Sequence, residues 1–213
     1  MTKKITLLIL TIFIYSISYG QEELKLYKRI YYSADSLNKI GSIRKLDSNV
    51  FLTAKSLDKL HPSKFFESAV ELLSKSKFDE AGFIFYLGSL RYRYYNSANP
   101  EYQPGNDGAL LASLKSIISE PVGMYLRTNI DNFISVLKAT VSYYNQNDFV
   151  FYSKNKDIEK YKDQSLGFSG FIADLEGDKE KYTIQWNLER KELENNIDAL
   201  IEGIKNNSIK QHK

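Results

Sequence analysis

Apolar residues recur at intervals of three and four along most of this chain, and few stretches alternate between apolar and polar residues. The first spacing places side chains on one face of an α-helix, whereas alternation indicates a half-buried strand. The cleanest example shares one face through Ile130, Phe133, Ile134, Leu137, Val141 and Tyr144. The pattern predicts a mainly α fold of six or seven helices in one bundle-like or repeat-like domain.

Several other segments show the same spacing. Helices are predicted over residues 62–75, 79–93, 110–120, 158–175 and 181–206, with a less regular helix after Gln21. Residues 83–90 leave hardly any polar face, which is typical of a helix surrounded by others. We therefore expect the helix over 79–93 at the centre of the fold. Pro121 is expected to stop the helix over 110–120. Gly167 and Gly170 are expected to permit close helix packing.

The first twenty residues have the three-part pattern of a cleavable secretory signal peptide. Two lysines precede an apolar run over residues 5–15, and Ser18 and Gly20 place small residues before Gln21. We therefore predict a signal peptide over 1–20, a single helical domain over 21–207, and a disordered polar tail over 208–213. The expected location is periplasmic or secreted, and the pattern does not choose between these two.

Membrane anchorage is not expected after cleavage. A spanning helix needs about 20 mainly apolar residues, and the apolar run near the N-terminus is roughly half that length. The chain contains no cysteine, so the acylated cysteine of a lipoprotein and all disulfides are excluded. The fold must therefore be held by its core alone.

Charge and histidine content exclude further classes of function. Removal of residues 1–20 takes away two lysines and no acidic residue, which reduces the formal net charge from +3 to +1. Nucleic-acid binding draws on an excess of clustered cations, so no nucleic-acid partner is expected. The only histidines are His61 and His212. No metal site, no cofactor and no phosphate-binding glycine motif is predicted.

Residues 65–93 resemble a single helical hairpin of the tetratricopeptide type. The positions typical of that family are occupied by Phe65, Ala69, Leu72, Ala81, Phe85 and Gly88, with a turn over 75–78. The segment departs from the family at Ser68, usually leucine, and at Arg93, usually proline. Tandem repeats bury each other's faces, and no second copy occurs at a period near 34 residues. The resemblance implies packing geometry and protein or peptide binding, in an isolated hairpin or in an array.

The most suggestive local feature lies at the end of this hairpin. Arginine and tyrosine alternate here, and residues of these two types are enriched at interface hot spots. The predicted partner-binding residues are Arg91, Tyr92, Arg93, Tyr95 and Tyr102. The alternative is that the tyrosines belong to the core and the arginines pair with nearby acids.

Two functions are compatible with these observations. The first is a non-catalytic exported helical protein that acts by protein–protein contact, as an adaptor or by neutralising a toxin. The second is a hydrolase of cell-wall or glycan material that uses paired carboxylates. No catalytic residue is predicted, because a Ser-His-Asp arrangement would need His61, which lies just before a helix with no nucleophile motif in view. The oligomeric state is left open.

Overall fold

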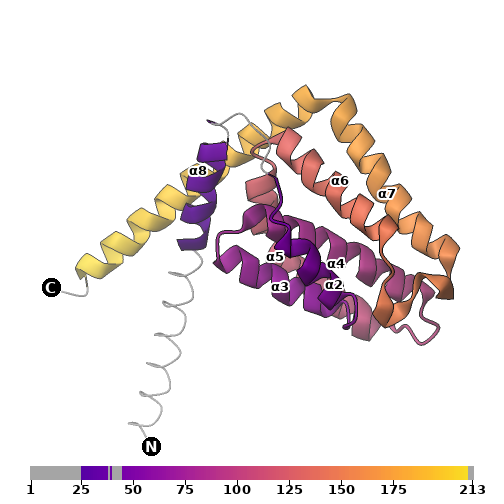
Figure 1. Cartoon of the computed structure of the whole chain (residues 1–213). Helices are drawn as coiled ribbons and strands as arrows, with labels where there is room; N and C mark the ends of the chain where they lie inside the picture. The colour runs from indigo at the N-terminus through magenta and orange to yellow at the C-terminus, as the bar shows by residue number, and fades with distance from the viewer. Residues whose placement is uncertain (1–24, 38, 40–44, 211–213) are drawn as a thin grey trace, which may run out of the picture.

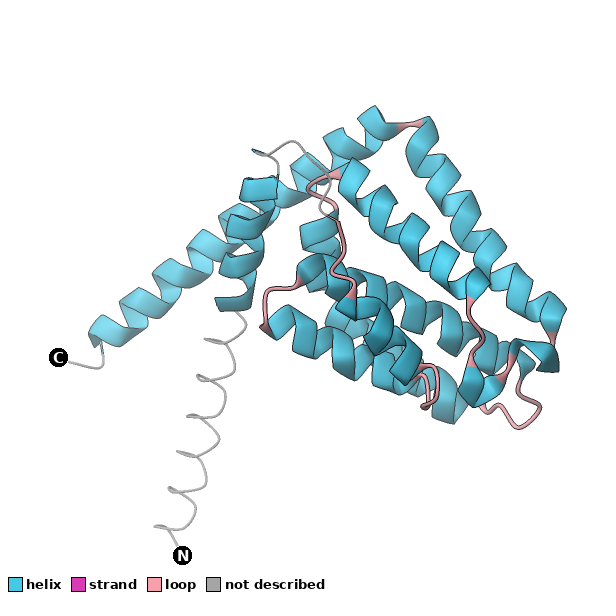
Figure 2. Ribbon diagram, in the orientation of Figure 1, coloured by secondary structure: helices cyan, strands magenta, loops and turns pink. Residues whose placement is uncertain are grey.

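The computed structural model describes residues 25–37, 39 and 45–210. Residues 25–37 are helical, and seven further α-helices follow in the described part of the chain: α2 (Asn49–Leu57), α3 (Ser63–Ser74), α4 (Phe78–Ala98), α5 (Ala109–Leu126), α6 (Ile130–Gln146), α7 (Ile158–Gly177) and α8 (Lys179–Lys210). No strand occurs among these residues (Figure 2). The prediction of a mainly α fold is confirmed. The predicted signal peptide lies outside the described residues.

Helix α4 is the centre of the fold, as its apolar pattern predicts. It contacts α2, α3, α5, α6 and α7, and most of its side chains from Phe78 to Tyr94 are buried. A helix with this many neighbours needs apolar residues around its whole circumference. The helices that contact α4 are therefore arranged around it (Figure 1).

Helices α3 and α4 form the predicted hairpin, joined by the turn over residues 75–77. Gly88 makes their close approach possible, because a Cβ atom added there would lie 2.4 Å from the Cβ of Phe65. Buried Phe65, Phe66 and Ala69 fill the interface from the α3 side. The likeness of this hairpin to the tetratricopeptide family stays a prediction.

The sequence predicts that α5 stops at Pro121. The helix instead continues for five more residues, to Leu126. Proline in a helix interior removes one hydrogen bond and costs ~3 kcal/mol. Burial of Val122, Tyr125 and Leu126 offsets that cost, since each large apolar side chain contributes ~1.5–3 kcal/mol when it is fully buried. Tertiary packing therefore overrides the local signal.

Helices α6 and α7 pack against each other and both contact α4. Asn129 caps α6 by accepting a hydrogen bond from the backbone N–H of Asn132 at 2.9 Å. Helix α7 forms despite its glycines, but Gly167 and Gly170 have no atom within 4 Å of an added Cβ. They face open space, so the expectation that they permit close packing is wrong.

The two ends of the described chain meet beside the bundle. Figure 1 shows the helical segment 25–37 lying across α8, the long yellow helix. Arg190 of α8 donates from Nη2 to Asp35 Oδ1 at 3.0 Å, over 155 positions of sequence. Helix α8 ends at Lys210, so residues 208–210 of the predicted disordered tail are helical. The described helices include none that is long and apolar enough to cross a membrane.

Candidate binding pocket between the two ends of the chain

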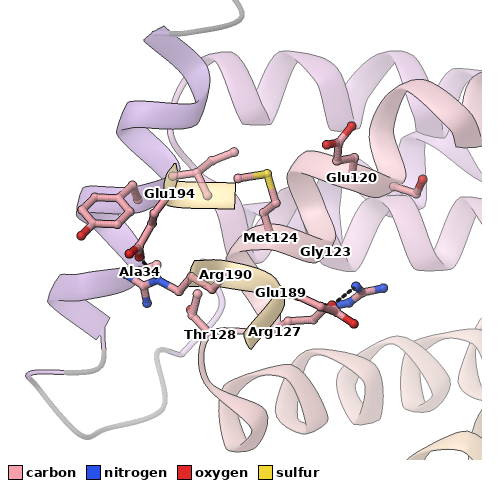
Figure 3. Close-up of a pocket in the computed structure, with 12 residues that line it drawn as sticks. Ala34, Glu120, Gly123, Met124, Arg127, Thr128, Glu189, Arg190 and Glu194 are labelled. Carbon is pink, nitrogen blue, oxygen red and sulfur yellow. Dashed lines mark hydrogen bonds and ion pairs between the residues drawn. The ribbon is translucent and has the colours of Figure 1, made fainter. Parts of the chain in front are cut away.

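A cavity of about 390 Å³ opens where the two chain ends meet. Its walls come from three segments that are distant in sequence: the helical segment 25–37, the C-terminal half of α5 and the middle of α8. The lining residues are Ile30, Tyr31, Ala34, Ser119, Glu120, Gly123, Met124, Arg127, Thr128, Glu189, Arg190 and Glu194 (Figure 3). Two arginines and three glutamates therefore face one cavity, which we call the end pocket.

Arg190 forms one side of the end pocket. Its Nε donates to Glu194 Oε1 at 3.0 Å, and its Nη2 donates to Asp35 at the same distance. The guanidinium carbon also lies 5.0 Å from the centre of the Tyr31 ring, within the range of a cation–π contact. This charge is largely buried and fully engaged, so its main role is to hold α8 against the segment 25–37.

Arg127 forms the opposite side through a separate ion pair. Its Nη1 donates to Glu189 Oε2 at 3.0 Å, and Glu189 accepts a second hydrogen bond from Gln185 at 3.0 Å. Figure 3 shows this pair apart from the pair of Arg190 and Glu194. Both arginines are therefore matched by carboxylates within the pocket wall.

Glu120 is the remaining charge of the lining. It lies on α5, one helical turn before Met124, and its carboxylate is exposed. Among the residues that the structure describes, it makes no ion pair and no hydrogen bond. Because both arginines are already engaged, the end pocket presents an unneutralised negative charge at its rim.

The floor of the end pocket is apolar and small. Ile30 and Ala34 are buried beneath it, Met124 is half-buried, and Gly123 leaves space. The nearest side chain to a Cβ atom added at Gly123 would be that of Arg127, at 3.6 Å. The absent side chain at Gly123 is thus part of what makes room for the cavity.

The structure places Arg91, a predicted partner-binding residue, in the core instead. Its side chain is 0% exposed, and its Nε lies 2.8 Å from Asp58 Oδ1. The guanidinium also donates to the carbonyl of Asn147 at 3.1 Å and to the hydroxyl of Tyr161. Tyr143 donates to the second Asp58 oxygen at 3.1 Å. Burial raises the pKa of the Asp58 carboxyl, and Arg91 and Tyr143 oppose that shift.

Aromatic rings complete the surroundings of Arg91. Tyr144 and Tyr161 stack with ring centres 4.2 Å apart, and the guanidinium carbon lies 4.8 Å from the Tyr144 ring centre. Burial raises the pKa of Tyr161 to about 12, so its hydroxyl stays protonated and donates to the Tyr144 carbonyl at 2.6 Å. The network joins α4 to the segments around α6 and α7.

Of the other four predicted residues, Tyr92 and Tyr95 lie together against His61, with their ring centres 6.3 Å apart. Successive residues of a helix point about 100° apart, so Tyr92 is buried and Arg93 is exposed beside Phe168 of α7, at 5.9 Å from its ring. Tyr95 is half-buried against His61, and Tyr102 is half-buried beside Gly108. The prediction is corrected for Arg91 and Tyr92, which offer no exposed side chain. Contact through Arg93, Tyr95 and Tyr102 stays a prediction.

Sequence reasoning missed the end pocket. Its charged residues lie on segments separated by more than 60 positions, and none of them belongs to a local motif. A weak signal existed in the apolar spacing after Gln21, which predicts a helix with a face to cover. In the described residues, no group of three or more acidic or histidine side chains is arranged to hold a metal ion.

Comparison of the chain with models of known protein families, with curated proteins and with solved structures finds no match.

Proposed function

We propose that this protein is exported and acts by contact with another protein, as an adaptor or by neutralising a toxin, and that the end pocket receives a basic side chain of the partner. The observation that carries the proposal is the unneutralised Glu120 at the rim of a pocket whose arginines are both engaged. Charge complementarity of this kind selects partners and sets the register of binding.

The dimensions of the end pocket support the same occupant. A cavity of about 390 Å³ lies at the lower end of the range of ligand sites. Lysine and arginine bury an aliphatic stem and keep the charged head near water. Ile30 and Met124 provide an apolar bed for such a stem, and Glu120 provides the carboxylate for its head.

The alternative of a paired-carboxylate hydrolase draws no support from this pocket. That chemistry needs two carboxylates on either side of a glycosidic bond. Glu189 and Glu194 are each bound to an arginine at 3.0 Å. The buried carboxylates of Asp58 and Asp79 lie in separate hydrogen-bond networks outside the pocket.

Site-specific photo-crosslinking tests the proposal. A benzophenone amino acid is introduced at Thr128, which lines the end pocket, and at Leu166, which is exposed on α7. In cells that export the chain, we expect a discrete crosslinked protein from position 128 and none from position 166. Equal crosslinking at both positions, or none at either, contradicts contact at this pocket.

Charge variants then test the occupant. Glu120→Lys should lower the crosslink yield at position 128 about tenfold or more, because close interfacial charge pairs couple by ~1.5 kcal/mol or more. Glu159→Lys on the exposed start of α7 is the matched control and should leave the yield unchanged. If Glu120→Lys leaves the yield unchanged, the occupant is not basic.

A further inference from the structure

The structure brings Ser63 and Asp107 to the two ring nitrogens of His61. Ser63 Oγ lies 2.9 Å from His61 Nδ1, and Asp107 Oδ1 lies 3.6 Å from His61 Nε2. His61 and Ser63 precede and begin α3, whereas Asp107 belongs to the short π-helical turn Pro104–Gly108. A hydroxyl and a carboxylate thus lie at the two nitrogens of one imidazole.

The backbone assigns the tautomer of this imidazole. The N–H of Ser63 lies 3.3 Å from His61 Nδ1, and a backbone N–H can only donate. Nδ1 therefore carries the lone pair and Nε2 carries the hydrogen, which faces Asp107. In this tautomer the ring is ready to accept the hydroxyl proton of Ser63.

The protonation state suits a general base. Burial, and to a smaller extent the nearby Lys64 ammonium, lowers the pKa of His61 below its ordinary value of 6.5, although Asp107 acts in the opposite direction. The imidazole is therefore neutral at pH 7. A general base must be unprotonated at the working pH.

The imidazole is held in place and remains accessible. Tyr92, Tyr95 and Phe151 meet the His61 ring edge-on, with centres 5.4–5.6 Å apart. Tyr92 also donates to Asp107 Oδ1 at 3.4 Å. The His61 side chain nevertheless keeps 31% of its surface exposed, and Ser63 is half-buried. Small reagents can therefore reach the hydroxyl.

Apolar surface adjoins His61, whose ring contacts Phe151. Leu60 and Phe151 are both exposed, and the backbone N–H of Phe151 donates to the carbonyl of Asp58 at 2.8 Å, which keeps the two segments together. An acyl chain can lie on this surface.

We propose that Ser63 is a nucleophile toward esters of apolar acyl groups, with His61 as its general base and Asp107 as a positioning residue. The Ser63 oxygen bonds to the ester carbonyl while His61 Nδ1 takes the hydroxyl proton. That proton passes to the departing alkoxide, which leaves as the alcohol. Water then attacks the acyl-serine, His61 again takes and returns the proton, and the carboxylic acid leaves with Ser63 restored.

This activity lies at the other end of α4 from the end pocket and is independent of contact there. Gly82, early in α4, contacts Leu126 beside the end pocket, whereas Tyr92 and Tyr95, late in α4, contact His61. Failure of one proposal therefore leaves the other unaffected.

A fluorophosphonate probe, which transfers its phosphonyl group to an activated serine with loss of fluoride, tests the proposal on the folded chain. Mass spectrometry of peptides should locate the adduct on Ser63. The labelling rate should rise with pH through a midpoint below 6.5, as His61 loses its proton. Hydrolysis of p-nitrophenyl butyrate should follow the same profile.

Variants separate catalysis from helix capping. His61→Gln should slow labelling about 100-fold, the usual contribution of a general base, and Asp107→Asn should slow it less. Ser68→Ala, at a half-buried serine of the same helix, is the matched control and should label at the wild-type rate. Unchanged circular dichroism verifies the fold of each variant.

Two results would overturn the proposal. The first is an absence of adduct on Ser63 in the wild-type chain, which requires no variant. The second is labelling that His61→Gln leaves unchanged. Either result would assign His61 and Ser63 to capping of α3 alone.

Discussion

Arg91 Nε lies 2.8 Å from Asp58 Oδ1 in the core, although 33 positions separate the two residues. Tyr143 donates to Asp58, and Tyr161 accepts from Arg91. The polar atoms of the ion pair are therefore satisfied without water. A buried ion pair adds little net stability, but removal of one partner leaves an uncompensated charge. The pair therefore makes the packing of α2, α4 and α7 depend on a few atoms.

Asp58→Asn tests this dependence. The amide keeps the shape of the carboxylate but leaves the Arg91 charge without its partner, so we expect the free energy of unfolding to fall by about 3–5 kcal/mol. Urea denaturation followed by circular dichroism measures the change. Arg93→Gln, at an exposed position of the same helix, is the control and should change stability by less than about 0.5 kcal/mol. A similar loss in both variants contradicts the expectation.

Two glycine variants test the closeness of the α3 and α4 hairpin. Gly88→Ala should destabilise the protein by about 1–3 kcal/mol, because the new methyl group overlaps the Phe65 Cβ. Gly167→Ala meets no atom within 4 Å and should stabilise α7 by about 1 kcal/mol through helix propensity. Opposite shifts of the thermal midpoint are therefore expected, and shifts of the same sign would show that the hairpin can spread.

The pH dependence of stability should report on His61. Its folded pKa lies below the ordinary 6.5, so the folded state binds this proton more weakly than the unfolded state does. Its contribution is constant above pH 6.5 and falls as the pH drops toward the folded pKa. The difference in unfolding free energy between wild type and His61→Gln, measured from pH 8 to pH 5, should therefore shrink at the acid end. A constant difference rules out this linkage.

Trp186 should report the docking of α8. It is the only tryptophan, it is 7% exposed, and its ring centre lies 5.7 Å from that of Phe133 on α6. Phe133→Ala opens a cavity at this contact and should cost about 3–5 kcal/mol. The fluorescence of Trp186 should shift to longer wavelength as water reaches the indole. An unshifted spectrum would show that Tyr182 and Arg127 keep the indole covered without Phe133.

The sequence predicted the helices well because burial imposes the three-and-four spacing directly on each of them. It failed at Pro121, where the local stop signal was weaker than the burial of Val122 and Tyr125. For Arg91 the sequence left two interpretations open, partner binding and pairing with an acid, and the structure shows the ion pair with Asp58. The partners of this arginine lie 33 positions before it and 70 positions after it, and no local pattern records them.

The candidate sites escaped prediction for the same reason. Asp107 faces His61, 46 positions earlier, and no local pattern links these two residues. The end pocket combines three segments, each of which looks in sequence like an ordinary amphipathic helix. Which helix faces meet is decided by the tertiary arrangement and cannot be read from the spacing within each helix.

The contact between Asp35 and Arg190 also sets an order of events during synthesis. Asp35 leaves the ribosome 155 residues before its partner, and until then the segment 25–37 has no α8 against which to close. A chain that ends before Glu189 lacks the wall of the end pocket that Glu189, Arg190 and Glu194 form. The end pocket is therefore completed only when residues 189–194 of α8 have been added to the chain.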